Sequence, residues 1–208
     1  MTETAKLLSG FSAFREAYFA DSPELFRALH REGQKPRILV IACSDSRVDP
    51  AILFNAEPGE LFVVRNVANL VPPYQPDGQY HGTSAAIEFA VRDLGVSEIL
   101  VLGHSSCGGI GALRDLARGR PETREFIGPW VAIAADACSA HAGAREVEQA
   151  AIRQSVANLR TFPWLAEREA AGELALHGWW FDLETGSLWR LTNAAFEPVD
   201  AGTRETSR

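Results

Sequence analysis

The chain has 208 residues, of which 46% are hydrophobic and 23% are charged, values that argue against a disordered or fibrous protein. Twenty-seven acidic against twenty basic residues give a formal net charge of −7, which disfavours nucleic-acid binding. No stretch approaches the ~20 apolar residues of a membrane span, and the N-terminus does not read as a signal peptide. We therefore expect a soluble, cytoplasmic protein with neither a nucleic-acid nor a membrane partner.

The first thirty-three residues predict a helical arm with two amphipathic helices, 3–18 and 23–31. The first helix carries a rich set of apolar side chains: Leu7, Leu8, Phe11, Phe14 and Phe19. Such a face needs cover, either from the body of the protein or from a second subunit. We expect a homodimer or a higher homo-oligomer.

From residue 37 onward the pattern changes to short apolar runs that alternate with helical segments. Strands are predicted at 37–43, 61–66, 98–104, 174–181 and 187–191. Helices are predicted at 83–94, 110–118, 122–140 and 144–159. This alternation favours parallel pairing, and the turn at 184–187 makes the last strand an antiparallel hairpin partner.

The expected fold is therefore an α/β domain with a mostly parallel central sheet, flanked by helices and ending in an antiparallel strand. Residues 1–208 are predicted to form one domain, in which 1–33 is the arm and 201–208 a frayed tail. No internal repeat or low-complexity segment interrupts it.

Reactive side chains directly follow two of the predicted strands. Cys43 ends the first strand, and His104 and Cys107 follow the third. In an open parallel sheet, ligands bind at the carboxyl ends of the strands, so these residues are expected to face one crevice. Two thiolates and an imidazole suit tetrahedral zinc, and three protein ligands leave the fourth position open, as in catalytic zinc sites. The third cysteine, Cys138, reads as a small residue of a helical core.

Asp45 and Arg47 lie two residues apart after the first strand, where both can project to the same side. A charge-assisted pair would keep Asp45 ionised, so that its carboxylate could accept a hydrogen bond from a zinc-bound water or ligate the zinc. These two roles exclude each other. Arg65 reads as a support for the loop beneath the site or as a partner across a subunit interface, and we favour the support.

Three motifs in order resemble those of the β-class carbonic anhydrases. They are CSDSR at 43–47, PGELFVVRNVAN at 58–69 and GHSSCGGI at 103–110. The resemblance implies that Cys43, His104 and Cys107 bind one Zn²⁺ per chain and that Asp45 and Arg47 are the catalytic dyad. It also implies a substrate-binding set: Gln34, Phe62, Val67, Phe89 and Gly108.

The activity that this resemblance implies is reversible hydration of carbon dioxide to bicarbonate and a proton by a zinc-bound hydroxide. It also implies an obligate dimer held by the N-terminal helices. The similarity is closest to the plant-type branch, because Val40 stands where the bicarbonate-regulated branch has Trp. We therefore expect Asp45 to be displaced from zinc at neutral pH.

Three alternatives stay open at this point. The same fold and zinc could hydrolyse carbonyl sulfide or carbon disulfide. A Cys–His pair could act as a hydrolase nucleophile, using Cys43 or Cys107 with His104. A structural zinc module could bind a partner through its N-terminal helices and turn over nothing.

Overall fold

The computed structural model describes residues 2–120, 122–193 and 195–200, and the chain divides into two compact units, Met1–Lys35 and Pro36–Arg208. The predicted frayed tail at 201–208 lies outside the described residues. Among the described residues, the helices are all too short or too polar to cross a membrane.

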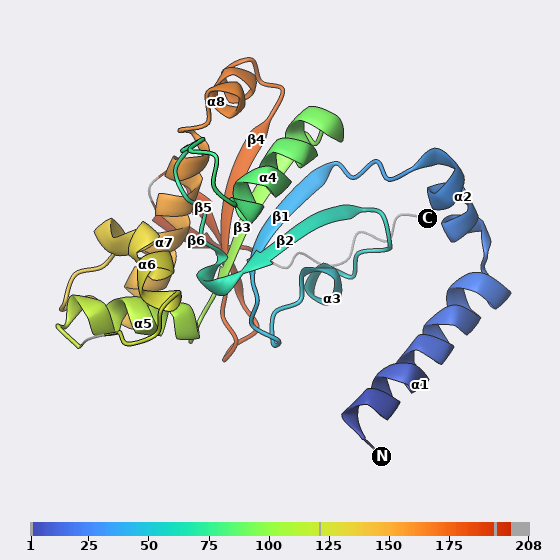
Figure 1. Ribbon diagram of the computed structural model, residues 1–208, viewed down its shortest axis with the longest axis horizontal. Coiled ribbons are helices and arrows are strands. Elements are labelled where there is room, and N and C mark those ends of the chain that lie inside the picture. The colour runs from blue at the N-terminus through green and yellow to red at the C-terminus, as the bar shows by residue number, and fades with distance from the viewer. Residues whose placement is uncertain (1, 121, 194, 201–208) are drawn as a thin grey trace. The chain divides into compact units, whose positions relative to one another are not determined.

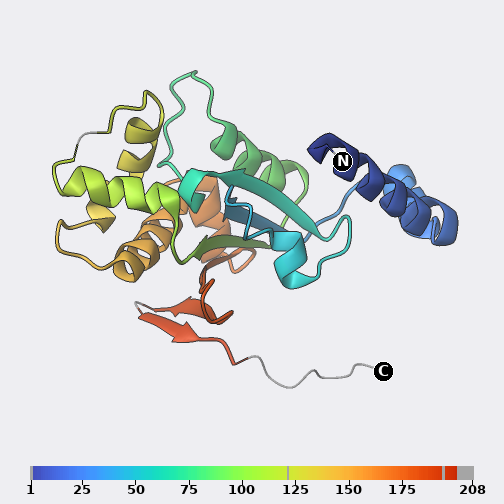
Figure 2. The ribbon, with the colours of Figure 1, turned by 90° about the horizontal axis from the view of Figure 1, so that it is seen from below.

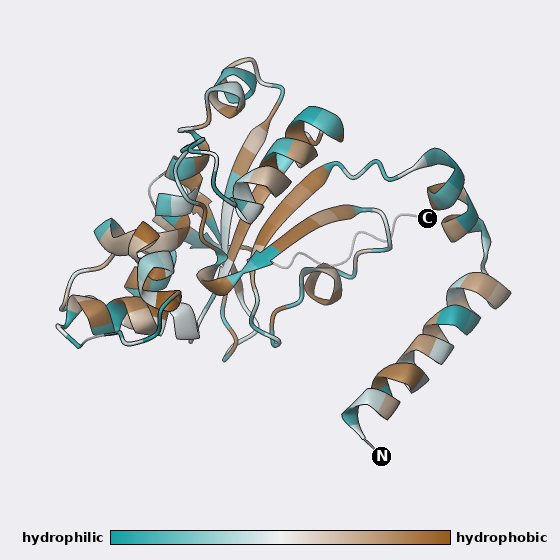
Figure 3. Cartoon of the chain, in the orientation of Figure 1, coloured by the Kyte–Doolittle hydropathy of each residue, from teal (hydrophilic) through white to brown (hydrophobic). Residues whose placement is uncertain are grey.

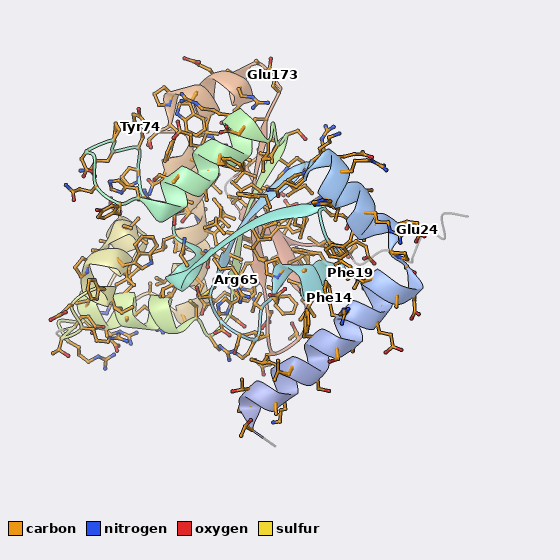
Figure 4. The ribbon with its side chains drawn as sticks, turned by 45° about the vertical axis from the view of Figure 1, so that its right-hand side comes forward. Phe14, Phe19, Glu24, Arg65, Tyr74 and Glu173 are labelled. Carbon is orange, nitrogen blue, oxygen red and sulfur yellow. The ribbon has the colours of Figure 1, made fainter. Side chains whose placement is uncertain are left out.

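The first unit is helical, as the sequence predicts. It consists of α1 (Glu3–Arg15), a π-helix (Glu16–Asp21) and α2 (Glu24–Glu32). Thr2 caps α1 by accepting a hydrogen bond from the backbone N of Ala5 at 3.2 Å. Four aromatic rings pack together with centroids 4.9–6.1 Å apart: Phe14, Tyr18, Phe19 and Phe26. Figure 4 labels two of them.

The second unit is built on one six-stranded sheet in the order β2-β1-β3-β4-β5-β6 (Figure 1). The strands are β1 (Ile38–Cys43), β2 (Leu61–Asn66), β3 (Glu98–His104), β4 (Ala175–Phe181), β5 (Leu188–Thr192) and β6 (Ala195–Pro198). The first four strands pair in parallel, whereas β5 and β6 are antiparallel. This confirms the predicted mostly parallel sheet with an antiparallel end.

The helices of this unit and its shorter turns lie between and after the strands. They are α3 (Pro50–Phe54), α4 (Gly82–Glu88), α5 (Gly108–Ala117), α6 (Ile127–Val131), α7 (Ala144–Leu159) and α8 (Pro163–Ala170), with 3₁₀ turns at Val67–Asn69 and Ala132–Ala137 and a π turn at Phe89–Asp93. Figure 2 shows the sheet edge-on among these helices, with β5 and β6 at one end.

The central strands are apolar on both faces, which is why they read as continuous hydrophobic runs. In β1 every residue from Leu39 to Cys43 is buried. Alternate residues of β1 and β3 pack against α4, α7 and α8, and the others face α3 and the last strands. Figure 3 shows β1 and β2 as hydrophobic along most of their length and β2 as polar at its carboxyl end. Polar groups therefore gather where the strands end.

Helix α7 lies unusually close to the sheet because glycines face it. A Cβ atom added at Gly103 would come within 2.6 Å of Ile152 Cδ1, and one at Gly178 within 2.8 Å of Ile152 Cγ2. Any larger residue at these strand positions would push the helix away from the sheet. This close packing fixes α7 directly behind the end of β3.

One predicted helix needs correction, and some elements were not predicted from the sequence. The helix predicted at 122–140 is wrong in extent, because only α6 and a 3₁₀ turn form there. Pro129 has no N–H and is tolerated only in the first turn, so the helix cannot begin more than a turn before it, and Ala134 leaves helical geometry. The sequence analysis also missed α8, which begins with Pro163, and the edge strand β6, which ends with Pro198.

Candidate metal centre

Three metal-binding side chains meet at the carboxyl edge of the sheet. Cys43 is the last residue of β1 and His104 the last of β3, while Cys107 directly precedes α5. Their ligand atoms all lie within 4.8 Å of one another, and the two sulfur atoms are 3.9 Å apart. All three residues are at most 5% exposed. The strand topology thus joins two sequence positions, 43 and 104, that lie far apart along the chain.

The imidazole of His104 is oriented as a metal ligand would be. Its Nδ1 lies 2.8 Å from the carbonyl oxygen of Ser105, which can only accept, so the proton belongs on Nδ1. The other nitrogen, Nε2, is buried and has no hydrogen-bond partner among the described residues. A buried lone pair without a partner beside two thiols fits a bound metal ion.

The two thiols lie within hydrogen-bonding distance of each other. Hydrogen bonding with Cys107 lowers the pKa of Cys43, and the same contact together with burial raises the pKa of Cys107. Thiolates are the form of cysteine that binds metals, and a lowered pKa at Cys43 favours that form.

The backbone around Cys107 is shaped for this position. Ser106 adopts a left-handed conformation with φ of 58°, and α5 begins at Gly108. A Cβ at Gly109 would come within 2.7 Å of Val67 Cγ1 and 2.9 Å of Ala68 Cβ. The glycine therefore allows the start of α5 to approach the turn after β2, and the helix N-terminus favours negative charge at Cys107.

Asp45 and Arg47 form the predicted pair beside these ligands. Arg47 Nε donates to Asp45 Oδ1 at 2.9 Å and Nη2 donates to Oδ2 at 2.7 Å, in a two-pronged contact. This hydrogen bonding from Arg47 holds the pKa of Asp45 well below its usual range. Asp45 Oδ2 lies 3.9 Å from His104 Nε2. An ionised carboxylate thus borders the metal-binding cluster.

Arg65 supports the loop that carries the dyad, as we favoured from the sequence. It lies at the end of β2, and Figure 4 labels it. Its guanidinium donates to the carbonyl oxygens of Cys43 (2.9 Å), Asp45 (2.7 Å) and Val48 (3.3 Å) and to Asp49 Oδ2 (2.8 Å). One side chain thereby fixes the backbone of Cys43, in the cluster, and of Asp45 beside it.

The predicted substrate-binding residues fall into different places. The rings of Phe62 and Phe89 are 5.9 Å apart, and Phe89 is 44% exposed. Val67 lines an apolar hollow together with Trp130, whose Nε1 donates to the carbonyl oxygen of Val67 at 2.7 Å. Gly108 is adjacent to Cys107 at the start of α5, whereas Gln34 belongs to the first unit.

Comparison with known proteins identifies the family. The sequence model of the carbonic anhydrase family matches residues 38–188, a range that contains both ligand-bearing strands. The chain belongs to the β-class carbonic anhydrases. It is 45% identical over 199 residues to a carbonic anhydrase of Pseudomonas aeruginosa, with 91% of this chain and 88% of that protein covered.

Other relatives agree on the class. A chloroplastic β-carbonic anhydrase of Arabidopsis thaliana is 39% identical, with 89% of this chain and 64% of that protein covered. The solved structure of the β-carbonic anhydrase CcaA superposes with a TM-score of 0.83 at 34% identity, covering 95% of this chain and all of that one. The chain is thus a carbonic anhydrase enzyme, and the reading as a structural module without turnover is set aside.

Proposed function

We propose that this β-class carbonic anhydrase catalyses the reversible hydration of carbon dioxide to bicarbonate and a proton, with one zinc ion per chain. The observation that carries the proposal is the cluster of three buried ligand atoms within 4.8 Å of one another, next to the Asp45 carboxylate. Its relative in Pseudomonas aeruginosa carries the name carbonic anhydrase.

The residues proposed to hold the zinc are Cys43, His104 and Cys107. Two sulfur ligands and one nitrogen ligand suit zinc better than they suit magnesium, calcium or manganese, which prefer oxygen. When bound, zinc supplies Lewis acidity and lowers the pKa of a bound water from 15.7 to roughly 7. Three protein ligands leave a position open for that water.

The proposed role of Asp45 is to accept a hydrogen bond from the attacking water and so to aim its lone pair at the carbon of carbon dioxide. Arg47 keeps this carboxylate ionised and fixes both of its oxygens. Both oxygens of the Asp45 carboxylate accept hydrogen bonds from Arg47. We therefore propose that Asp45 does not ligate zinc at neutral pH, as we expect for the plant-type branch.

Substrate binding is proposed to use apolar side chains and one helix terminus. Phe62, Val67 and Phe89 would exclude water around a small uncharged substrate. The backbone N–H of Gly108, at the positive end of α5, would bind an oxygen of bicarbonate. Gln34 is proposed as a further substrate-binding residue. The proton then leaves toward solvent, to which Arg47 is exposed.

We also propose that the enzyme is a cytoplasmic homodimer or a larger homo-oligomer. Several apolar side chains of α1 are exposed in the single chain, Leu7 at 74% and Phe11 at 60%, and a second copy would cover them. A solved relative from Sordaria macrospora is described as tetrameric. Light scattering at micromolar concentration tests this, and a monomer would contradict it.

The substrate is tested by assaying one zinc-quantified preparation on three substrates. Stopped-flow measurement at pH 7–9 follows hydration of carbon dioxide, and sulfide release follows hydrolysis of carbonyl sulfide and carbon disulfide. We expect fast hydration of carbon dioxide. Sulfide release with slow hydration would instead support the alternative substrates, which share the fold and the metal ligands.

The same preparation separates metal chemistry from a cysteine nucleophile. Removal of the metal by a chelator should abolish turnover, and added zinc should restore it. A Cys–His nucleophile would predict the opposite pattern, namely activity that survives chelation and is lost on alkylation with iodoacetamide.

A further inference from the structure

A buried carboxylate lies directly behind the metal-binding cluster. Glu148 is on α7 and is only 5% exposed. Its Oε1 lies 3.4 Å from the backbone N of Cys107, which donates to it, and its Oε2 accepts a hydrogen bond from Trp180 Nε1 at 3.1 Å. None of the ion pairs in the described part of the chain includes Glu148.

Burying a carboxylate at this position costs solvation free energy. The Glu148 carboxylate is removed from water and forms no ion pair among the described residues, so the two N–H groups that donate to it replace its lost contacts with water. The buried positions nearest to it on α7 are apolar: Val147, Ala151 and Ile152. An apolar residue at 148 would pack there with less loss of solvation, which indicates that the carboxylate serves the groups that it contacts.

One of these two groups belongs to Cys107 itself, and the other lies on β4, the strand next to the one that ends in His104. Cys107 directly precedes α5 and follows Ser106. Ser106 has a left-handed backbone conformation but is not a glycine, so contacts around it must stabilise this conformation. Trp180 lies on β4, where it is paired with Gly103, the residue before His104. One carboxylate therefore ties the Cys107 segment to the part of the sheet that holds His104.

Trp180, the second donor to Glu148, is itself held in place by its neighbours. Trp180 is 2% exposed, and its ring lies 6.5 Å from that of Trp189. The guanidinium of Arg145, on the first turn of α7, lies 4.7 Å from the ring of Trp180 and 4.1 Å from that of Trp189. The indole N–H that Glu148 accepts from is thus held in place, so the carboxylate has a rigid anchor.

We infer that Glu148 is a positioning residue for the metal centre: it holds the Cys107 segment in the metal-binding conformation and thereby sets the affinity of the site for zinc. The inference rests on the proposed function only in taking the metal to be zinc. Its measured quantity is zinc affinity, which is independent of the substrate that the enzyme turns over.

The test compares Glu148→Ala and Glu148→Gln with a control, Glu167→Ala, at an exposed position on α8. Zinc affinity is measured by competition with a chromophoric chelator, using zinc alone as the probe. Loss of an outer contact to a metal ligand typically weakens binding about 10–100-fold, and we expect Glu148→Ala to fall in that range. Glu148→Gln has one acceptor oxygen for two donors, so its affinity should lie between those of Glu148→Ala and the control.

Cobalt substitution gives a readout that general destabilisation does not move. A displaced Cys107 should change the sulfur-to-cobalt charge-transfer bands of Glu148→Gln, while those of Glu167→Ala stay as in the unmodified enzyme. If Glu148→Ala does not fold, Glu148→Gln decides by the same two measurements. Zinc affinity and cobalt spectra equal to the control in the folded variants would overturn the inference.

The two proposals fail separately. An unmodified enzyme that binds zinc tightly but does not hydrate carbon dioxide contradicts the proposed function and leaves the role of Glu148 intact. An enzyme that hydrates carbon dioxide while its Glu148 variants bind zinc as tightly as the control contradicts only the role of Glu148.

Discussion

Two short segments at the same edge of the sheet hold the site in different ways. In the segment after β3 the side chain of Cys107 is buried, and its backbone N–H donates a hydrogen bond to the buried Glu148 of α7. The segment after β1 carries the exposed Arg47 and is held from below by Arg65. Burial suits the thiolates, because it limits competing ligands and oxidants. Exposure suits the dyad, because protons must leave to solvent. Under the proposed function, the segment after β3 therefore serves metal binding and the segment after β1 serves proton transfer.

The largest effect is expected from removing Cys107, the proposed zinc ligand in the segment after β3. Cys107→Ala should lose bound zinc and lower kcat/KM by more than the roughly 100-fold that an outer-shell change costs. Metal analysis and stopped-flow hydration measure both. The matched control is Cys138→Ala, a cysteine outside the cluster, which should keep its zinc and its rate; a Cys107→Ala protein with a full complement of zinc would refute the assignment.

A change in the exposed segment should separate activity from metal binding. Asp45→Asn removes the charge that accepts the hydrogen bond of the attacking water, so kcat/KM should fall about 10²–10⁴-fold. Zinc content should stay the same, since Asp45 is outside the ligand cluster. Asp93→Asn, on an exposed turn, is the control. Undiminished activity of Asp45→Asn would remove this residue from the mechanism.

Weakening the contacts that Arg65 makes beneath Asp45 and Arg47 should lower the stability of the fold. Arg65→Lys leaves several of the acceptors around Cys43, Asp45 and Val48 without a donor, which should destabilise the fold by about 1–3 kcal/mol. For a chain of this length, that lowers Tm by roughly 2–4 °C per kcal/mol. Thermal unfolding is compared with Arg190→Lys, an exposed position on β5. Equal Tm values for the two variants would show that the Arg65 contacts contribute nothing.

The smallest expected effect concerns the turn after β4. Hydrogen bonding, first from the backbone N–H of Glu184 and then from the Thr185 and Ser105 hydroxyls, lowers the pKa of Asp182. This contribution to stability is complete above the unfolded-state pKa of about 3.9 and is lost as pH falls through the lower folded-state value. The Tm difference between the unmodified enzyme and Asp182→Asn should narrow below about pH 4. A difference that stays constant down to pH 3 contradicts this.

The mostly parallel sheet and the meeting of Cys43, His104 and Cys107 at one of its edges could be predicted because they depend on local patterns. Apolar runs that end in Cys43 and His104 place both residues at one edge of a parallel sheet, whatever the intervening chain does. Glu148 could not be found in this way. It reads as a polar residue in a helix, and only the close approach of α7 to Gly103 and Gly178 brings its carboxylate behind Cys107.

Backbone geometry near the site was equally hidden in the sequence. Ala68, Asn69 and Ser106 adopt left-handed conformations with φ of 66°, 49° and 58°. Alanine and serine have no local preference for that region, so tertiary packing imposes it. The extent of the helix predicted at 122–140 was wrong for a related reason, since the apolar spacing there ignored the missing N–H of Pro129.

The central claim is that zinc held by Cys43, His104 and Cys107 gives this enzyme its activity toward carbon dioxide. The most direct test is a zinc titration of the metal-free enzyme, followed by stopped-flow carbon dioxide hydration at pH 8. The account predicts no turnover without metal and a rate that rises in proportion to zinc until one equivalent per chain is bound. Turnover without metal, or a fully zinc-loaded enzyme that does not hydrate carbon dioxide, would contradict it.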